Sequence, residues 1–137
     1  FKITGFCPQF KGLWKEGTLR DHLWIFSRLK GLVGDDLTKD IDRLLTAYGL
    51  GEHADKFVSK CSGGTQRKLS CALALSVGKP CVTFLDEPTT GVDVGTRRLI
   101  WDRIKEASRE RVVVLTTHYM DEADALAQQI GIMVSGR

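Results

Sequence analysis

The spacing of apolar residues divides the chain into a helical first part and a second part in which strands and helices alternate. Before Pro80, apolar positions recur three or four residues apart, as they do on one face of an amphipathic helix. After Pro80, short continuous apolar runs alternate with stretches of helical spacing. Strands that alternate with helices are typical of βαβ units, in which crossover helices join parallel strands. The pattern therefore predicts an α/β fold with a parallel sheet in the second part.

Capping and turn residues set the expected bounds of these elements. Thr18 to Asp21 forms a capping box, which predicts the start of a helix. Glycines close the helical stretches, because they adopt the left-handed conformation that commonly ends a helix. The expected elements are a helix between Thr18 and Gly31, a helix from Thr38 to Gly49, a helix after Gly63-Gly64 that ends at Gly78, and then a strand at 81–85, a helix at 96–107, a strand at 112–116, a helix at 119–127 and a strand at 130–134.

Charge and cysteine content bound the possible functions. The 137 residues include 20 basic and 17 acidic side chains, a net charge of +3, and the two signs are interspersed. This balance gives no reason to expect a nucleic-acid or membrane-surface partner. The four cysteines show no Cys-x-x-Cys or zinc spacing, so we expect reduced thiols, with Cys71 and Cys81 buried. No apolar run is long enough to span a bilayer, so any membrane spans would lie outside this chain.

Two adjacent carboxylates follow the first apolar strand of the second part. The run at 81–85 is rich in Val, Phe and Leu; Asp86 and Glu87 come next, and Pro88 ends the strand. In open α/β sheets, ligands bind beyond the carboxyl ends of the strands. Two acids at such a point are poorly suited to packing but well suited to holding Mg²⁺ and directing a water molecule. Asp86 and Glu87 are therefore candidate functional residues.

A glycine pair opens the third expected helix. Ser62 stands at the cap position, and Gly63 and Gly64 let an anion approach the backbone amides. The first turn carries Arg67 and Lys68 in place of acids. Basic side chains near a helix N-terminus are repelled by the positive end of the helix dipole, but they suit a helix tip that faces phosphate. On this motif alone, a phosphate-contacting tip and an ordinary capped helix are equally good interpretations.

A histidine follows the second apolar strand closely. Because parallel strands end at the same edge of a sheet, we expect His118 to lie near Asp86 and Glu87. Whether neutral or protonated, its ring can donate a hydrogen bond to a phosphoryl oxygen. Gln9, which follows Cys7-Pro8, carries no information by itself.

Taken together, the motifs stand in a specific order along the chain: Gln9, Ser62-Gly63-Gly64, Asp86-Glu87-Pro88, Gly91-Val92-Asp93 and His118. This series resembles the nucleotide-binding domain of ATP-binding cassette (ABC) transporters, from its Q-loop to its H-switch. The residues at 87–91 and 97–101 resemble subfamily A, the lipid exporters, and those at 6–10 and 132–137 resemble the second cassette of such a protein. The resemblance implies a partial P-loop NTPase fold, in which a helical subdomain precedes the parallel-sheet core.

The resemblance implies a role for each residue at the expected sheet edge. Asp86 is expected to hold Mg²⁺ through water, and Gln9 to reach both the metal ion and the attacking water. Glu87 is expected to act as the base for that water, and His118 to contact the γ-phosphate of ATP. Phosphoryl transfer needs mainly positioning and charge neutralisation, which this set of residues would supply.

The resemblance also implies that two cassettes share each active site. The Ser62–Gly64 tip is expected to touch the γ-phosphate of ATP bound to an opposite cassette. Gln66 is assigned to the same nucleotide site; it stands one place after the usual signature glutamine position, which Thr65 occupies. Asp93 is expected in the D-loop at the dimer interface. ATP would thus join a second nucleotide-binding domain to this one.

The motifs divide the chain into four expected segments. They are the Q-loop edge of the core at 1–14, a helical subdomain at 15–60, the signature motif and its helix at 61–80, and an α/β catalytic core at 81–137.

The phosphate-cradling loop Gly-x-x-x-x-Gly-Lys-Ser/Thr is absent from the sequence. Gly12 to Gly17 has the glycine spacing, but it lacks the Lys and Ser/Thr, and no strand is expected before it. Gly49 to Ala54 imitates a dinucleotide-binding loop but follows a helix rather than a strand. Neither is taken as a phosphate site. We expect the P-loop upstream of Phe1, so that this chain alone binds ATP weakly and hydrolyses little or none.

Three hypotheses for function follow. The leading one is the ATPase of a lipid transporter, at the cytoplasmic face of a membrane, with transmembrane domains and a second cassette as partners and the lipid as an indirect substrate. The second is a soluble ABC ATPase of the translation type. The third is a non-catalytic cassette that completes a partner's site; Glu87 argues against it, because degenerate sites often lose the base.

Overall fold

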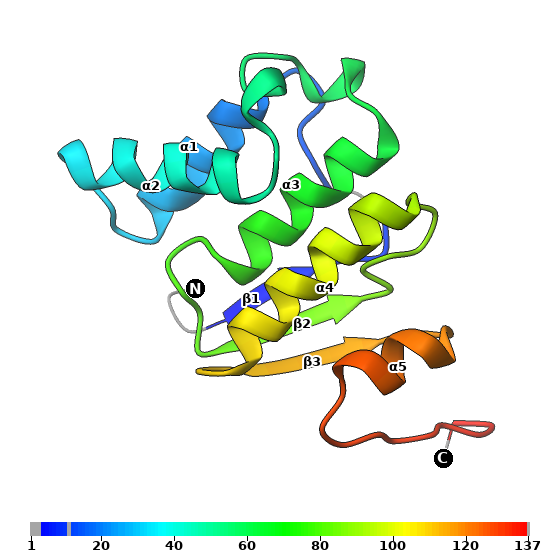
Figure 1. Ribbon diagram of the computed structural model, residues 1–137. Coiled ribbons are helices and arrows are strands. Elements are labelled where there is room, and N and C mark those ends of the chain that lie inside the picture. Colours follow the sequence, from blue (N-terminus) through cyan, green and yellow to red (C-terminus); the bar gives the residue numbers. More distant parts are fainter. Residues whose placement is uncertain (1–3, 11, 137) are drawn as a thin grey trace.

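A three-stranded parallel sheet with helices on one face forms the base of the molecule (Figure 1). The structure is a computed structural model that describes residues 4–10 and 12–136. Its elements, in chain order, are β1 (Thr4–Cys7), α1 (Leu19–Leu29), α2 (Gly34–Ala47), the short 3₁₀ turns η1 (Gly51–His53) and η2 (Val58–Lys60), α3 (Gly63–Leu75), β2 (Val82–Asp86), α4 (Val94–Ser108), β3 (Val112–Thr116) and α5 (Met120–Leu126).

The sheet has the order β1-β2-β3, and both neighbouring pairs are parallel. The chain passes from β2 to β3 through α4, and from β1 to β2 through the helical segment that ends in α3. Both connections are long enough to return the chain to the start of the next strand, as parallel pairing requires. The prediction of an α/β fold with a parallel sheet is therefore confirmed.

Strand β1 is not among the elements that the sequence pattern predicts. Its residue Gly5 lies where α3 crosses the sheet: a Cβ there would stand 1.9 Å from the Ala74 carbonyl oxygen. Only glycine allows this approach, yet a glycine followed closely by Pro8 is a poor strand signal. Because β1 precedes the loop at Gly12, one reason for excluding that loop as a phosphate site was wrong. The missing Lys and Ser/Thr still exclude it.

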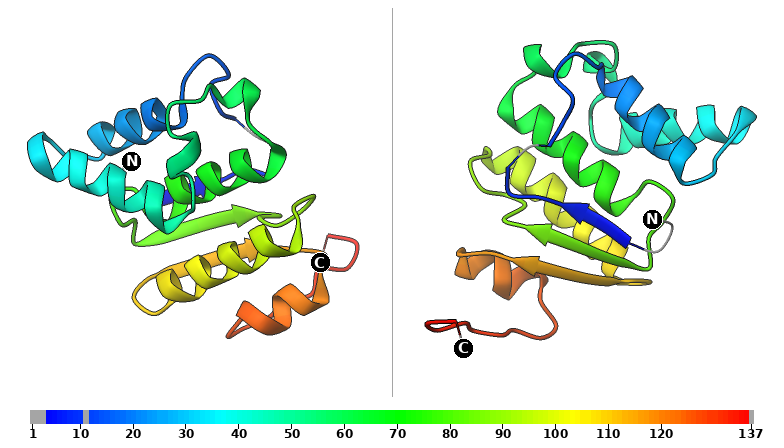
Figure 2. Two further views of the ribbon diagram at one scale, coloured as in Figure 1. Left: turned by 45° about the horizontal axis from the view of Figure 1, so that its top comes forward. Right: turned by 180° about the vertical axis from the view of Figure 1, so that it is seen from behind.

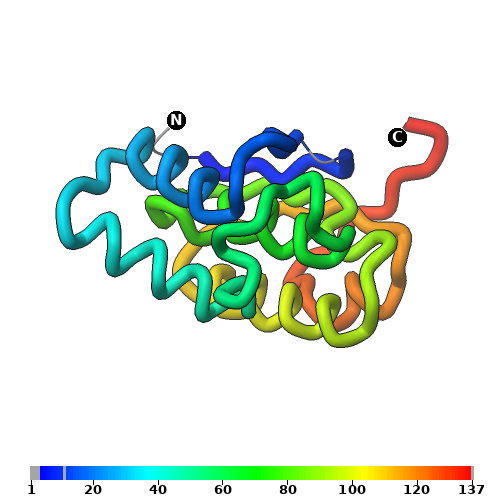
Figure 3. The backbone as a smooth tube through the Cα atoms, turned by 90° about the horizontal axis from the view of Figure 1, so that it is seen from above, coloured from blue at the N-terminus to red at the C-terminus, as the bar shows by residue number. Residues whose placement is uncertain are grey.

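Helices α1 and α2 form a separate layer that packs on α3 (Figures 1 and 3). The predicted capping box is confirmed: Thr18 Oγ1 accepts from the Asp21 N–H at 3.0 Å, and Asp21 Oδ2 accepts from the Thr18 N–H at 2.9 Å. The second helix starts at Gly34, so the prediction that it starts at Thr38 was wrong. Asp35 and Asp36 in its first turn complement the helix dipole in place of a side-chain cap.

One hydrophobic core joins the helical layer to the sheet. It runs from Leu23 in α1 and Leu44 in α2, through Leu69 in α3, to Leu85 in β2 and Ile100 in α4, all of them fully or almost fully buried. Since α3 contributes to both sides of this core, the position of one layer fixes that of the other.

The opposite face of the sheet is open (Figure 2). Phe6, Phe84 and Val114 stand side by side across the three strands and are 64%, 42% and 46% exposed. Within the described residues, exposed apolar side chains thus occur on each of the three strands of this face. Cys81, expected to be buried, is exposed just before β2, whereas Cys71 is buried as predicted.

The strand expected at 130–134 is absent from the described part of the chain. The segment after α5 is irregular, and Ile132, Met133 and Val134 are exposed. A strand needs a neighbour that completes its backbone hydrogen bonds, and this segment runs away from β3 (Figure 1). An apolar run alone was therefore not enough to form one.

Replacing Gly5 with alanine is expected to destabilise the fold by about 1–3 kcal/mol, because the new methyl group would overlap the Ala74 carbonyl of α3. Gly12→Ala is the matched control, since a Cβ at Gly12 meets nothing within 4 Å. Thermal unfolding of the two variants measures the difference. Equal melting temperatures would mean that α3 does not pack this closely on β1.

Candidate functional site

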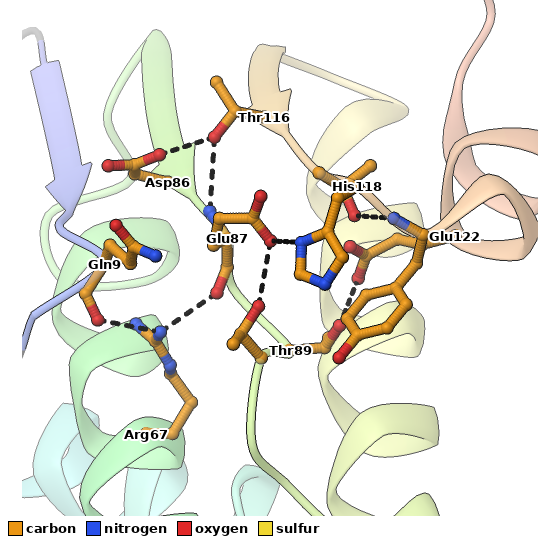
Figure 4. A network of polar contacts seen from close by, with 11 residues as sticks. Gln9, Arg67, Asp86, Glu87, Thr89, Thr116, His118 and Glu122 are labelled. Carbon is orange, nitrogen blue, oxygen red and sulfur yellow. Dashed lines mark hydrogen bonds and ion pairs between the residues drawn. The ribbon is translucent and has the colours of Figure 1, made fainter.

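The carboxyl ends of β2 and β3 carry three of the polar residues singled out in the sequence, namely Asp86, Glu87 and His118 (Figure 4). Asp86 is the last residue of β2 and is paired in register with Thr116, the last residue of β3. Glu87 and His118 follow these two strands. The structure therefore places Asp86, Glu87 and His118 at one sheet edge, as the parallel arrangement predicts.

Glu87 and His118 form a close pair. His118 Nδ1 lies 2.7 Å from Glu87 Oε2, and the Thr90 hydroxyl donates to the same oxygen at 2.8 Å. An ionised carboxylate can only accept, so Nδ1 carries the proton and the second ring nitrogen, Nε2, remains as the acceptor. The Glu87 side chain is 17% exposed and that of His118 is 58% exposed. The carboxylate is thus sheltered behind a more accessible imidazole.

Glu87 adopts the left-handed backbone conformation, with φ of 49°. This conformation costs a non-glycine residue about 1–2 kcal/mol, so the surrounding contacts must hold it. Its N–H donates to the Thr116 carbonyl at 3.1 Å, and its own carbonyl accepts from Arg67 Nη2 at 2.9 Å. The peptide groups on both sides of the Glu87 side chain are therefore fixed.

Asp86 offers one carboxylate oxygen for a further contact. Oδ1 accepts from the Thr116 hydroxyl at 2.5 Å, and Figure 4 shows the Gln9 side chain on the Asp86 side of the site. The described residues contain no group of three or more His, Cys, Asp or Glu that could enclose a metal ion. One free carboxylate oxygen beside an amide suits Mg²⁺, which keeps several water ligands and needs few from protein.

The Ser62–Gly64 tip forms the beginning of α3. Ser62 caps the helix, with its hydroxyl accepting from the Thr65 N–H at 3.2 Å, and both Ser62 and Gly63 are exposed. Gly64 lies against the start of α4, since a Cβ there would meet Thr96 Oγ1 at 3.3 Å. No hydrogen bond between described residues joins this tip to Asp86, Glu87 or His118. Within one chain, the tip and the acid pair are therefore separate.

Asp93 and Gln66 both make local contacts. Asp93 is the N-cap of α4: its carboxylate accepts from the Thr96 N–H at 2.9 Å and from the Thr96 hydroxyl at 2.7 Å. These two hydrogen bonds lower the pKa of Asp93, whose side chain is fully exposed. Gln66 Nε2 donates to the carbonyls of Val58 and Cys61, both at 2.9 Å. Its amide thus holds the turn before the tip.

Arg67 lies inside the protein and does not extend to the helix tip. It is 3% exposed and donates to the carbonyls of Pro8, Gln9 and Glu87. The suggestion that basic residues of this turn serve a phosphate-facing tip is therefore wrong for Arg67, and it is wrong for Lys68 too, whose Nζ donates to the Gly49 carbonyl at 3.1 Å. A signal was available, because Arg67 shares a helix face with Cys71 and Leu75 at intervals of four, and both of these are buried.

Glu122 is a second polar residue that the sequence analysis missed. It is fully buried, and its Oε1 accepts from the Thr89 hydroxyl and from Trp101 Nε1, both at 2.8 Å. Glu122 thereby ties α5 to α4 and to the loop that follows Glu87. Its position next to Asp121 in the first turn of a helix gave no sign of burial.

A comparison with solved structures identifies the class of fold. A solved structure entitled "Structure of ATP binding subunit of ABC transporter" superimposes with a TM-score of 0.80 at 23% identity, and the match covers 91% of this chain and 52% of that chain. The chain therefore has the α/β fold of the P-loop NTPases.

The family follows from the sequence itself. A family model described as "ABC transporter" matches residues 2–90. The human cholesterol transporter ABCA5 is 42% identical over 99% of this chain, and the Arabidopsis thaliana ABC transporter A family member 8 is 45% identical over 99% of it. The chain belongs to the ABC transporter family, and these relatives are of subfamily A, as the motifs predicted. It spans only 8% and 15% of the length of these two relatives.

Replacing Glu87 with glycine is expected to leave the protein about 1 kcal/mol more stable than replacing it with alanine. Both changes remove the carboxylate, but only glycine adopts the left-handed conformation without steric cost. Thermal unfolding of the two variants measures the difference. The control pair is Glu52→Gly and Glu52→Ala, where φ is not positive and glycine should be the less stable. Equal stability at Glu87 would contradict the strained backbone.

Proposed function

We propose that this chain forms the catalytic and signature part of an ATP-hydrolysing cassette that powers transport across a membrane. The observation that carries the proposal is the Glu87–His118 pair, with a 2.7 Å contact, beside Asp86 at the carboxyl edge of the sheet. A base, an acid oriented for a cation and an imidazole stand where a nucleotide would bind in such a fold. This is the arrangement that hydrolysis of a terminal phosphate needs.

In this proposal each residue at the sheet edge has one task. Asp86 would hold Mg²⁺ through water with its free carboxylate oxygen, and the exposed Gln9 side chain would contribute from the loop that follows the neighbouring strand β1. Glu87 accepts a proton from the attacking water. His118 keeps its Nδ1–H on Glu87 and turns Nε2 outward; when protonated, Nε2 donates to a γ-phosphate oxygen. Bound Mg²⁺ would supply charge neutralisation for the phosphate oxygens.

The Ser62–Gly64 tip acts on ATP held by a second cassette. Three features support this: Ser62 and Gly63 are exposed, the two glycines carry no side chain that would keep an anion from their amides, and the tip makes no hydrogen bond to its own acid pair. Gln66 supports the tip by bonding the turn before it. The exposed Asp93 lies next to Gly64, so it belongs to the same dimer surface. Nucleotide would thus join the two cassettes.

The transported substrate is proposed to be a lipid, because the human relative is named a cholesterol transporter. The partners are then transmembrane domains and a second nucleotide-binding domain, with the cassette at the cytoplasmic face. None of the helices in the described residues is long and apolar enough to cross a bilayer. The near balance of basic and acidic residues gives no support to a nucleic-acid partner.

Replacing Glu87 with glutamine in the full-length protein is expected to lower ATP hydrolysis at least about 100-fold, because the amide cannot take the proton from water. ATP binding should remain, since the shape of the side chain is kept. Steady-state phosphate release and nucleotide trapping measure the two properties, with Glu52→Gln as an exposed control. Unchanged hydrolysis would contradict the catalytic assignment and favour a non-catalytic partner cassette.

The chain of residues 1–137 alone is expected to bind ATP with a dissociation constant of ~1 mM or weaker. The sequence has no Gly-x-x-x-x-Gly-Lys-Ser/Thr loop, whose amides and lysine would hold the α-, β- and γ-phosphates. Equilibrium dialysis with MgATP tests this, after circular dichroism has shown that the chain is folded. Micromolar binding would mean that the affinity resides in the residues present here.

A further inference from the structure

We propose that Arg67 is a positioning residue that holds the Gln9 segment and the Glu87 peptide in one arrangement, and so links the signature helix to the catalytic carboxylate. This inference rests on the proposed function, because it assigns Arg67 a task in the same site. In Figure 4, Arg67 lies below Gln9 and Glu87 and contacts their backbone carbonyls, not their side chains.

The contacts of Arg67 are backbone carbonyls from two separate parts of the chain. Nη1 donates to the Pro8 carbonyl at 2.8 Å, and Nη2 donates to the carbonyls of Gln9 at 3.0 Å and Glu87 at 2.9 Å. Nη1 also lies 3.7 Å from the Cys7 Sγ. One side chain of α3 therefore joins the end of β1 to the loop after β2.

The burial of Arg67 requires this set of partners. A guanidinium that is 3% exposed has lost its water, and no ion pair of the described residues compensates its charge. The three carbonyl dipoles take the place of water and of a counter-ion. Lysine could not replace it, because an ammonium group lacks the planar fork that reaches three oxygens in fixed directions.

Arg67 holds the strained residue of the site. Glu87 has a left-handed backbone, and its N–H is held by Thr116 while its carbonyl is held by Arg67. If the bond from Arg67 is lost, the peptide after Glu87 can rotate and the carboxylate leaves its place beside His118. Because Arg67 Nη2 also holds the Gln9 carbonyl, the same loss releases Gln9. The two residues are thus released together.

The position of Arg67 on α3 connects the site to the Ser62–Gly64 tip, because both belong to the same helix. Arg67 lies one turn after the Ser62–Gly64 tip of the same helix. A second cassette that presses on this tip would move α3 as a rigid element, and Arg67 would carry the movement to Gln9 and Glu87. The geometry therefore provides a physical path from the proposed dimer surface to Glu87, the proposed catalytic base of the same chain.

The first test is Arg67→Lys in the full-length protein, with Lys68→Met as the matched control. The Lys68 ammonium makes one hydrogen bond, to the exposed Gly49 carbonyl at 3.1 Å. Arg67→Lys should lower kcat for ATP hydrolysis about 10- to 100-fold, because a small displacement of a catalytic group has an effect of this size. KM should change less than about 3-fold and Lys68→Met should leave both constants within about 2-fold. Equal kcat values for the two variants would overturn the proposal.

The second test separates positioning from general loss of structure. If Arg67 acts through Gln9, then Arg67→Lys should lower kcat less in a Gln9→Ala background than in the original protein. A purely structural role predicts that the two effects multiply. Multiplicative effects would therefore overturn the coupling between Arg67 and Gln9.

The third test does not depend on hydrolysis. In full-length protein that carries Glu87→Gln, hydrogen exchange at residues 7–10 and 87–91 should be at least about 10-fold faster with Arg67→Lys than with Lys68→Met, while α1 and α2 stay unchanged. Faster exchange throughout the chain, or none in these segments, would contradict the proposal. If Arg67→Lys reduces the yield of folded protein, Arg67→Gln replaces it, because its neutral amide leaves no buried charge.

The outcomes distinguish the inference from the proposed function. If Glu87→Gln leaves hydrolysis unchanged, the proposed function is wrong whatever Arg67 does. If Glu87→Gln abolishes hydrolysis while Arg67→Lys behaves like Lys68→Met, only the role of Arg67 is wrong.

Discussion

The left-handed peptide at Glu87 is the constraint on which the site depends. Strand β2 runs straight to Asp86, and a residue with positive φ then turns the chain sharply, so that two successive carboxylates point to different places. Asp86 bonds Thr116 across the strand end, and Glu87 turns to His118. An extended Glu87 would point to the other face of the sheet, away from Asp86. The unfavourable conformation is therefore what keeps both adjacent acids at one sheet edge, where Asp86 contacts Thr116 and Glu87 contacts His118.

Contacts from several elements stabilise the left-handed turn at Glu87. The Glu87 N–H is bound from β3 and its carbonyl from α3, so both elements must be in place before the strain can be sustained. Helix α3 is fixed in turn by its contact with Gly5 of β1 and by the core that it shares with the helical layer. Glu122 closes the far side, bonding Thr89 two residues beyond Glu87. The geometry of the site therefore depends on the packing of the core.

Sequence patterns predicted those parts of the fold whose signal is local. Strand β3 was placed correctly at 112–116, and the cap at Thr18 followed from its own hydrogen-bonding chemistry. Strand β1 was missed, since its glycine is explained only by a helix that lies 69 residues later in the chain, at Ala74. The gathering of Asp86, Glu87 and His118 could be predicted from parallel strands alone. The Glu87–Arg67 bond could not, because backbone strain has no local sequence signal and the helical spacing that indicates the burial of Arg67 does not identify its partners.

The separation of the tip from the acid pair gives the proposed two-cassette site a physical reason. The side chains of Ser62 and Asp93 cap α3 and α4, and the two helix ends lie side by side on one exposed surface. The acid pair lies elsewhere, joined to this surface through α3 and Arg67. In the proposed two-cassette site, a nucleotide would take the tip and the acid pair from different copies. The capped helix ends are rigid. A binding partner can move the rest of the molecule only through a contact surface that does not deform.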